Sequence, residues 1–205
     1  MTVREWRLHQ YGEHAVLIDT PPGTAAAVAD HARRHFGALL LDAVPTADCV
    51  LLDFAQPTAA EQVARLLSAD QVGASSVGPP RQVVLAVSFD GPDLAQVAEA
   101  VGCSVEGVVD MLLGADLRVE FCGFAPGFAY LTGLPPALHL PRRATPRTRV
   151  PGGSVALAAG YAAVYPAASP GGWHLVGSTS RRLFDPCADP PALLQPGTRV
   201  RFTGG

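Results

Sequence analysis

Residues 154–177 read SVALAAGYAAVYPAASPGGWHLVG, and this stretch decides the fold class. Short apolar runs at 154–159, 162–165 and 174–177 are separated by turns that contain glycine or proline. Such runs, without helical periodicity, are typical of β-strands. The pattern predicts a β-barrel or β-sandwich with long loops for this half of the chain.

The same type of run recurs outside this stretch, at 82–87, 117–122 and 199–202. Between the first two of these runs, short helices are predicted at 92–101 and 104–113. Gly102 separates the two segments, and a residue of the capping type precedes each of them. The helices therefore belong to the β-rich part of the chain.

The first 70 residues predict a different, mixed arrangement. Two strands are predicted at 4–9 and 15–19, on either side of a turn at Tyr11 and Gly12. Short apolar runs at 39–44 and 49–54 predict two further strands, both buried. Thr24 is placed to cap a helix that ends near His35, and Thr58 with Glu61 forms a capping box for a helix at 59–68. The order β-β-α-β-β-α predicts an α+β sandwich with its helices on one face.

A Gly/Ser/Pro-rich segment at 72–80 is typical of a linker between these two parts. We therefore place a small α+β domain at residues 1–76 and a β-barrel domain at residues 77–205. The predicted fold class is α+β.

The composition excludes several kinds of chemistry. The chain has no lysine and no asparagine, and all 15 of its basic side chains are arginine. A Walker-type phosphate loop, Schiff-base chemistry, and anchored pyridoxal phosphate, biotin or lipoyl groups all require lysine. N-glycosylation requires asparagine. Any cationic role must therefore fall to arginine.

The sequence is typical of a cytoplasmic protein. No apolar stretch is long enough to cross a membrane, and the first residues lack the apolar core of a signal peptide. Four cysteines without a C-x-x-C pair argue against a zinc site or a disulfide framework: Cys49, Cys103, Cys122 and Cys187. We expect no bound metal.

The charges are unevenly distributed along the chain. Residues 1–120 hold seven Arg against 16 Asp and Glu, which gives −9, and residues 121–205 hold eight Arg against two acids, which gives +6. A pI of 6.0 argues against nucleic-acid binding. The basic C-terminal segment could still bind a small anion.

The first candidate motif is FCGFAPGFAY at residues 121–130. Aromatic rings on a glycine-containing loop can form a rigid wall for a ligand. The alternative is a loop whose aromatic side chains plug the end of the barrel.

The second motif is PRRATPRTRVPGGS at residues 141–154. Guanidinium groups bind carboxylate or phosphate in bidentate fashion, and no acidic residue lies nearby in the sequence. Gly152 and Gly153, just before Ser154, would leave backbone N–H groups free for an anion. The alternative is a solvated basic loop.

The remaining candidates each have a structural alternative. In SPGGWH, residues 169–174, Trp173 could line a ligand site or lie in the core below a hairpin. His31 and His35 have the spacing of metal ligands, although a solvated helix face explains them better. Cys122 could act as a nucleophile, but burial in a strand is the more ordinary explanation.

Several motifs in a fixed order resemble the KipI/PxpB family, which is also called allophanate hydrolase subunit 1. They are GFAPGFAYL, PRRATPRTRVPGGSV, YP-x-x-SPGGW, LFD and PGTRVRF, all between residues 123 and 202, with SFDGPDL at 88–94. The resemblance implies a small α+β N-terminal domain and a cyclophilin-like C-terminal β-barrel.

The resemblance also implies a function. Such proteins act as the PxpB component of a multi-subunit, ATP-dependent 5-oxoprolinase that opens 5-oxoproline to glutamate. The implied partners are a second subunit of the KipA/PxpC (allophanate hydrolase subunit 2) family and a PxpA-like third subunit. This chain is then inactive alone and binds no cofactor itself, and the complex uses ATP.

The family offers two alternatives to this function. One is a KipI-like inhibitor of a histidine kinase, and the other is half of a carboxyltransferase of the allophanate hydrolase or urea carboxylase type. A prolyl isomerase follows only by analogy with the barrel. Relatives commonly carry His, Gln and Arg where this chain has Leu112, Tyr161 and Ser178.

The predicted site is part of a composite anion site. Arg147 and the turn of Gly152, Gly153 and Ser154 would hold the anionic group, with Arg143 as a second cation. No catalytic residue is assigned, because the general base is expected on the partner. The predicted pocket wall consists of Phe124, Pro126, Gly127, Phe128, Tyr130, Tyr161 and Trp173.

Overall fold

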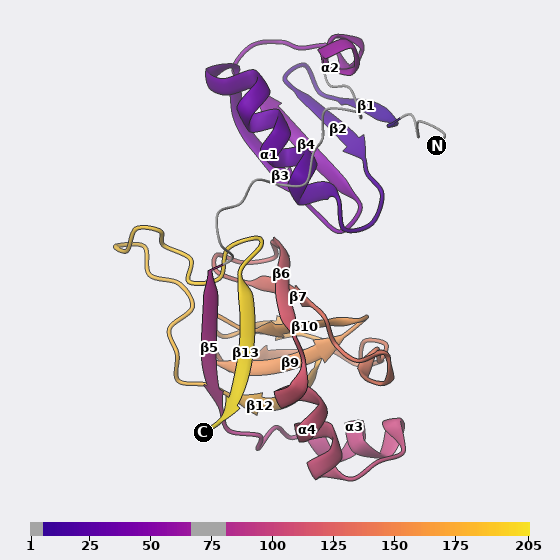
Figure 1. Cartoon of the computed structure of the whole chain (residues 1–205), viewed down its shortest axis with the longest axis vertical. Helices are drawn as coiled ribbons and strands as arrows, with labels where there is room; N and C mark the ends of the chain where they lie inside the picture. The colour runs from indigo at the N-terminus through magenta and orange to yellow at the C-terminus, as the bar shows by residue number, and fades with distance from the viewer. Residues whose placement is uncertain (1–5, 67–80) are drawn as a thin grey trace. The chain divides into compact units, whose positions relative to one another are not determined.

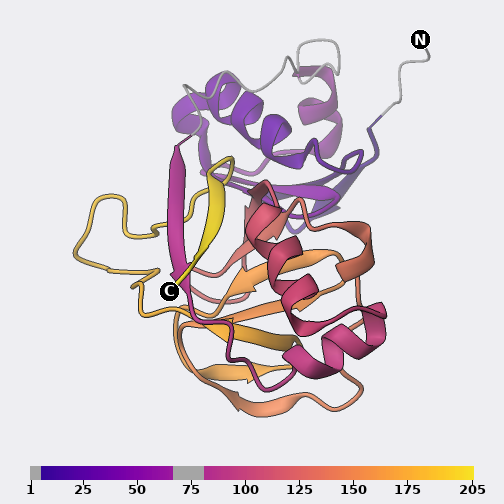
Figure 2. The same ribbon diagram turned by 60° about the horizontal axis from the view of Figure 1, so that its bottom comes forward.

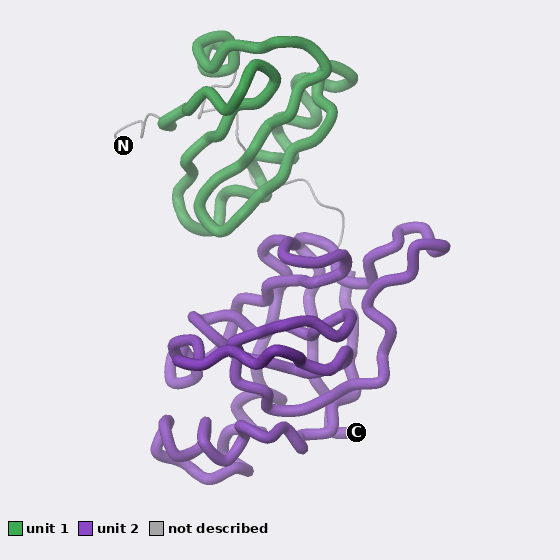
Figure 3. The backbone as a smooth tube through the Cα atoms, turned by 180° about the vertical axis from the view of Figure 1, so that it is seen from behind, with its two compact units in different colours: residues 1–79 green, residues 80–205 purple. Residues whose placement is uncertain are grey.

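The structure is a computed structural model that describes residues 6–66 and 81–205. The chain forms two compact units, residues 1–79 and residues 80–205 (Figure 3). The predicted domain boundary at 76/77 and the predicted linker at 72–80 fall outside the described residues. Among those that are described, no helix is both long and apolar enough to cross a membrane.

Unit 1 is a four-stranded antiparallel sheet in the order β1-β2-β4-β3, with helices packed on it (Figure 1). Its elements are β1 (Leu8–Tyr11), β2 (Ala15–Asp19), α1 (Ala25–Phe36), η1 (Gly37–Leu39), β3 (Leu40–Pro45), β4 (Cys49–Phe54) and α2 (Ala60–Leu66). Helix α1 packs on β3 and β4, and α2 packs on β1.

The central strand β4 shows why unit 1 folds in this way. Val50, Leu52 and Phe54 alternate with more exposed residues and join the core with the apolar face of α1. The edge strand β3 differs from the prediction of a buried strand. Leu41 and Val44 remain exposed because only β4 pairs with β3 and the helices cover the other face.

The predicted caps of both helices in unit 1 are wrong in detail. Thr24 precedes α1, but its hydroxyl donates to the carbonyl of Pro21 and makes no cap bond. The Thr58 hydroxyl likewise donates to the carbonyl of Gln56. The first N–H of α2, from Ala60, instead donates to Oε1 of Gln10, at 2.9 Å, which arrives from β1. A distant residue thus takes the place of the local capping box.

Unit 2 is a barrel-like sheet accompanied by two helices (Figures 1 and 2). Its elements are β5 (Gln82–Val87), α3 (Leu94–Val101), α4 (Val105–Gly114), β6 (Leu117–Cys122), β7 (Ala129–Thr132), η3 (Pro136–Leu138), β8 (Arg147–Val150), β9 (Ser154–Ala158), β10 (Tyr161–Val164), β11 (Ser169–Gly171), β12 (His174–Ser178) and β13 (Arg199–Gly204). The two expected helices and all the expected strands are present.

The seven-stranded sheet has the order β12-β9-β10-β7-β6-β13-β5, antiparallel except for the parallel pair β13 and β5. Its two edges meet at Ser88 and Ser178. Each residue donates its N–H to the carbonyl of the other, at 2.9 and 2.8 Å. This bridge brings the edge strands together, so the sheet is a nearly closed, cyclophilin-like barrel as predicted.

Strand β9 is buried on both faces, which explains its continuous apolar run. Val155 and Leu157 join the core that α3 and α4 cover. Ala156 and Ala158 face a second cluster, which contains Val150 of β8 and several aromatic residues. The small two-stranded sheet of β8 and β11 was not expected from the sequence, because its strands are short and contain arginine, glycine and proline.

Candidate functional site

The candidate site is built around Asp93, whose side chain is only 4% exposed. One carboxylate oxygen, Oδ1, accepts hydrogen bonds from Nη1 of Arg143 and Nη2 of Arg147, both at 2.7 Å. The other oxygen, Oδ2, accepts the backbone N–H of Leu175 at 2.7 Å. Asp93 therefore links helix α3, strand β12 and the arginine-rich residues 141–154, which we call the basic segment.

Asp93 reaches this position because the chain before α3 lies directly against β12. The N–H of Asp93 donates to the carbonyl of Leu175 at 3.0 Å. Two residues earlier, Gly91 lies so close to β12 that an added Cβ would be 2.3 Å from that carbonyl oxygen. Although Asp93 precedes α3, its side chain makes no cap bond, because the arginines and Leu175 use both carboxylate oxygens.

The electrostatics of this cluster favour full ionisation. Burial by itself raises the pKa of Asp93, but the hydrogen bonds from Arg147 and Leu175 and the charges of both arginines outweigh burial and hold the pKa below its ordinary value. The hydrogen bond from Arg147 to Asp93 in turn raises the pKa of Arg147. Asp93 thus stays charged at neutral pH.

Asp93 corrects the expectation that the arginines of residues 141–154 have no acidic partner. The arginines do have an acidic partner, but it lies 50 residues before Arg143 and 54 before Arg147, beyond the range of local charge patterns. The motif SFDGPDL contained Asp93, yet nothing in its local pattern indicated this role. Two guanidinium groups still face one carboxylate, so the cluster carries a net positive charge.

Polar atoms remain unpartnered around this cluster. Within the described residues, Nε of Arg143 and Nη1 of Arg147 are buried and have no hydrogen-bond partner. Unpartnered buried donors are costly, and a bound anion can satisfy them. The arrangement is therefore chemically suited to binding and orienting an anionic group.

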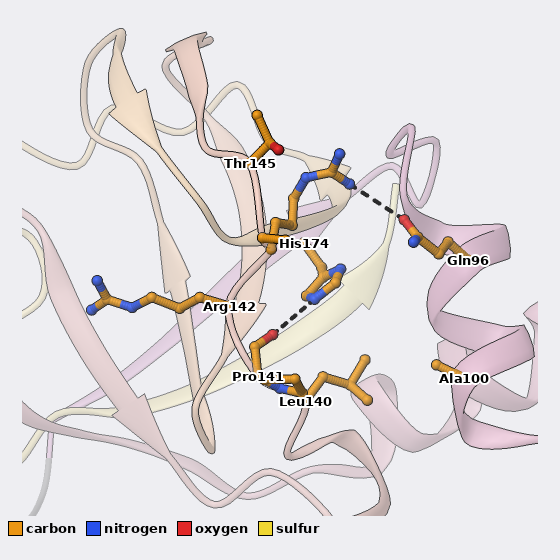
Figure 4. Close-up of a pocket in the computed structure, with 9 residues that line it drawn as sticks. Gln96, Ala100, Leu140, Pro141, Arg142, Thr145 and His174 are labelled. Carbon is orange, nitrogen blue, oxygen red and sulfur yellow. Dashed lines mark hydrogen bonds between the residues drawn. The ribbon is translucent and has the colours of Figure 1, made fainter.

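A cavity of about 370 Å³ lies between α3 and the start of the basic segment (Figure 4). Its lining residues are Gln96, Ala100, Leu140, Pro141, Arg142, Arg143, Ala144, Thr145 and His174. Arg143 is the only residue of the predicted site among these nine. Arg147 does not line this cavity, but it shares the carboxylate of Asp93 with Arg143, which does.

In the turn of Gly152, Gly153 and Ser154, two of the N–H groups that were predicted to be free for an anion donate within the chain. The N–H of Gly153 donates to the carbonyl of Tyr165 at 2.7 Å, and that of Ser154 donates to Pro151 at 3.4 Å. Gly153 has a positive φ of 84°, and its added Cβ would be 2.3 Å from the carbonyl oxygen of Thr179. These glycines allow close packing of the backbone.

The aromatic residues form a cluster on the far face of β9 and β10, not around the cavity. Phe128 and Trp173 are buried, and their ring centroids are 5.8 Å apart. Tyr130 lies 5.7 Å from both Trp173 and Tyr161. Much of the predicted pocket wall is thus core packing, the alternative that the sequence left open.

Three further residues of the predicted wall lie with Phe128 on the loop between β6 and β7. Phe124 is 64% exposed and has a positive φ of 68°, and Pro126 is also exposed. Gly127 is buried, and an added Cβ would be 2.6 Å from Cβ of Phe184. The loop therefore packs against the segment after β12 and presents Phe124 to solvent.

The positions that differ from common relatives have defined surroundings. Leu112 is fully buried in the core of unit 2. Tyr161 contacts the aromatic cluster, with its ring 5.8 Å from Phe121. The Ser178 hydroxyl donates to Asp90 at 3.1 Å, and its backbone closes the barrel.

The weaker candidates have structural explanations. His31 and His35 stack with ring centroids 6.0 Å apart on α1. Over the described residues, no group of three or more His, Cys, Asp and Glu could hold a metal ion. The Cys122 thiol is half-buried and donates to the carbonyl of Leu194 at 3.5 Å, and burial raises its pKa to about 11.

We expect Cys122 to react slowly with alkylating reagents. At pH 8 a thiol of such high pKa is only about 0.1% thiolate, and the thiolate is the reactive form. Cys103 and Cys187 are exposed. Peptide mass spectrometry after timed iodoacetamide treatment should show Cys122 labelled at least about tenfold more slowly than these two. In urea the difference should disappear; equal rates in the native chain would contradict its burial.

The sequence profile of the carboxyltransferase domain, subdomain C and D, matches residues 6–194 of the chain. A relative from Escherichia coli O157:H7, named as a subunit of 5-oxoprolinase, is 54% identical over 112 residues, which are 55% of this chain and 51% of the relative. Two further relatives with the same name, from Haemophilus influenzae and Bacillus subtilis, are 46% and 43% identical. The chain spans about half the length of the curated relatives it matches.

Solved structures show the same fold. The structure of TTHA0988 matches with a TM-score of 0.80 and 34% identity over 93% of this chain and 40% of that one. The urea carboxylase of Kluyveromyces lactis matches with a TM-score of 0.76 over 98% of this chain and 22% of that one. Its identity of 20% shows a shared fold.

Proposed function

Because the chain belongs to the family of carboxyltransferase domains, subdomain C and D, and within it to the KipI/PxpB family, we propose that it is one subunit of a 5-oxoprolinase. The complex would use ATP to open 5-oxoproline, a cyclic amide with a carboxylate, to glutamate. The observation that carries this proposal is the name shared by three relatives of 43–54% identity, each of them a subunit of 5-oxoprolinase.

The cationic cluster gives this chain a role in such a complex. Arg143 and Arg147 are held by a buried carboxylate, so their side chains are oriented before any ligand arrives. Preorganised cations bind an anionic group with little reorganisation. In our proposal the arginines bind and orient the anionic substrate or intermediate, while the general base and the ATP site lie on partner subunits.

The partners follow from the same family. We propose a second subunit of the KipA/PxpC family and a PxpA-like third subunit. The relatives' name designates one subunit of an enzyme, which supports an assembly of several chains.

Arg147→Ala should reduce the 5-oxoprolinase rate of the assembled complex by about tenfold or more, because one charge-assisted hydrogen bond contributes about 1.5–3 kcal/mol. The chain would be co-expressed with the second subunit, supplied with the third, and assayed for ATP-dependent formation of glutamate. Arg149→Ala is the matched control, since Arg149 lies exposed on the same strand.

Assembly of each variant must be verified by size-exclusion chromatography, because Arg147 also supports Asp93. If the wild-type complex is active and the assembled Arg147→Ala complex keeps its full rate, this role of Arg147 is wrong. A complex of all three subunits without 5-oxoproline turnover would contradict the proposed function itself.

A further inference from the structure

The loop between β6 and β7 holds a large aromatic side chain in solvent on a strained backbone. Phe124 is 64% exposed and has a φ of 68°, and across it the N–H of Ala125 donates to the carbonyl of Gly123 at 2.8 Å. This hydrogen bond around a positive φ is the rare, strained form of the γ-turn. Backbone strain of this kind persists only where the surrounding structure fixes it, and it is concentrated at functional sites.

The rest of the loop fixes this turn. In residues 125–128 the last N–H donates to the first carbonyl at 2.9 Å, with Pro126 second and Gly127, at a φ of 81°, third. Proline followed by such a glycine is favoured in a type II turn. The N–H of Gly123 closes the loop on the carbonyl of Phe128 at 3.2 Å. The loop is therefore rigid before a partner arrives, which lowers the entropy lost on binding.

Phe124 continues an aromatic surface on the outside of the barrel. Its ring lies 5.2 Å from the buried ring of Phe128, which lies 5.1 Å from the ring of Tyr130. The ring of Phe121 stacks on that of Tyr130 at 4.3 Å, and Phe121, Tyr130 and Tyr161 are all partly exposed. Aromatic residues are enriched at protein–protein interfaces, and they dominate the binding energy there. Phe124 thus has the properties of an anchor for a protein partner.

The charges beside this loop indicate the chemistry of the partner. Phe184 packs so closely against the loop that an added Cβ on Gly127 would lie 2.6 Å from its Cβ. Arg181 and Arg182, just before Phe184, are exposed, and within the described residues only Arg182 has an ion pair, with Asp185 at 3.1 Å. Two copies of this face would bring like charges together, whereas acidic residues on a different protein would be complementary to them.

We propose that Phe124 anchors a docking surface for the second subunit of the proposed enzyme, and that its ring enters an apolar pocket with an acidic rim on that subunit. The docking surface consists of Phe121, Phe124, Tyr130, Tyr161 and Arg181. This inference rests on the proposed function for the existence of a second subunit. It adds the surface of this chain to which that subunit binds and the side chain that carries the binding.

Isothermal titration of the full chain with the purified second subunit would test this surface. Phe124→Ala should weaken the binding by about 30-fold or more, the loss typical of an interface hot spot. Tyr11→Ala is the matched control, because Tyr11 is also 64% exposed but lies on β1 of unit 1, and it should bind like the wild type. Equal affinities of the wild type and Phe124→Ala would overturn the proposal.

Arg181→Ala tests the acidic rim separately. This variant should bind the second subunit about threefold more weakly at low ionic strength, because an exposed ion pair contributes little. The difference from the wild type should shrink as salt is added, since salt screens exposed charges. Tighter binding of Arg181→Ala would show a basic rim on the partner and would contradict the proposed chemistry.

Phe124→Gly separates a docking role from a structural one. Glycine adopts a positive φ without steric conflict, so this variant relieves the strain and removes the ring. We expect its midpoint of urea denaturation to stay at or above that of the wild type, while its affinity for the second subunit falls by about 30-fold. A lower midpoint with unchanged affinity would show that the ring supports the fold and does not bind a partner.

The outcomes distinguish this inference from the proposed function. If the second subunit binds the wild type and both Phe124 variants equally, and the complete complex turns over 5-oxoproline, the proposed function stands and this surface is wrong. If binding depends on Phe124 but the complete complex has no turnover, the surface stands and the proposed activity is wrong. Sedimentation of the chain alone tests a second copy as the occupant: a dimer that Phe124→Ala dissociates would overturn the assignment to the second subunit.

Discussion

Replacing Asp93 by asparagine should lower the free energy of unfolding by about 3–5 kcal/mol, the usual cost of removing one partner from a buried ion pair. The carboxylate accepts at both oxygens, from Arg143, Arg147 and the N–H of Leu175. An asparagine side chain has one acceptor and one donor group. Its NH₂ group must therefore face either the arginines or the Leu175 N–H, and the two cations lose their counter-charge.

Urea denaturation followed by circular dichroism would measure this loss. Asp90→Asn is the matched control, because Asp90 is exposed and accepts from the Ser178 hydroxyl at 3.1 Å. We expect a change within about 0.5 kcal/mol for this surface substitution. A loss of less than about 1 kcal/mol for Asp93→Asn would show that the ion pairs do not hold unit 2 together.

The stability difference between the wild type and Asp93→Asn should also depend on pH in a defined direction. The pKa of Asp93 is lowered in the folded chain, whereas the unfolded chain has an ordinary value of about 3.9. The contribution is therefore complete above about pH 4 and is lost as the pH falls through the folded value. Denaturation at several pH values should give a constant difference near neutrality that narrows below about pH 4.

Gly91→Ala should destabilise the chain by about 3 kcal/mol, the upper part of the usual range for overpacking. The new Cβ would lie 2.3 Å from the carbonyl oxygen of Leu175 and 2.5 Å from the nitrogen of Gly177. Both atoms belong to the backbone of β12, so no side-chain rotation can relieve the contact. The segment that carries Asp93 would have to move away from β12.

Gly114→Ala provides the comparison for this substitution. Gly114 is the last residue of α4, and an added Cβ would meet nothing within 4 Å. Alanine in a helix is about 0.5–1 kcal/mol more favourable than glycine, so this variant should be slightly more stable. The two midpoints of urea denaturation should therefore shift in opposite directions. A Gly91→Ala variant as stable as the wild type would disprove the close approach of the two segments.

The local pattern was sufficient for elements with strong apolar periodicity. The runs at 82–87 and 117–122 became β5 and β6, and Gly102, with φ 74°, separates α3 from α4 as expected. Strand β11, which reads SPG, carries no such pattern and forms because β8 pairs with it. The local pattern also could not predict that Gln10 caps α2, since this hydrogen bond joins residues 50 positions apart.

The sequence predicted which residue types make up the candidate site, but it did not predict which residues contact one another there. The cluster of arginines at 142–149 is evident in the sequence, and the positive charge does lie beside a cavity. Glycines and aromatic residues in the same motifs were assigned to ligand binding, yet Gly153 and Phe128 are packed into the fold. A motif alone does not separate a residue that contacts ligand from one that supports the backbone around it.

The sequence by itself determined the α+β class, the barrel strands, the absence of lysine chemistry and the family. These properties depend on periodicity, composition and ordered motifs, which are local. Only the tertiary structure brought Asp93 to Arg143 and Arg147 and joined Ser88 to Ser178. A charge acts on whatever lies within a few ångströms in space, so its partner is decided by how the barrel closes and not by neighbours along the chain.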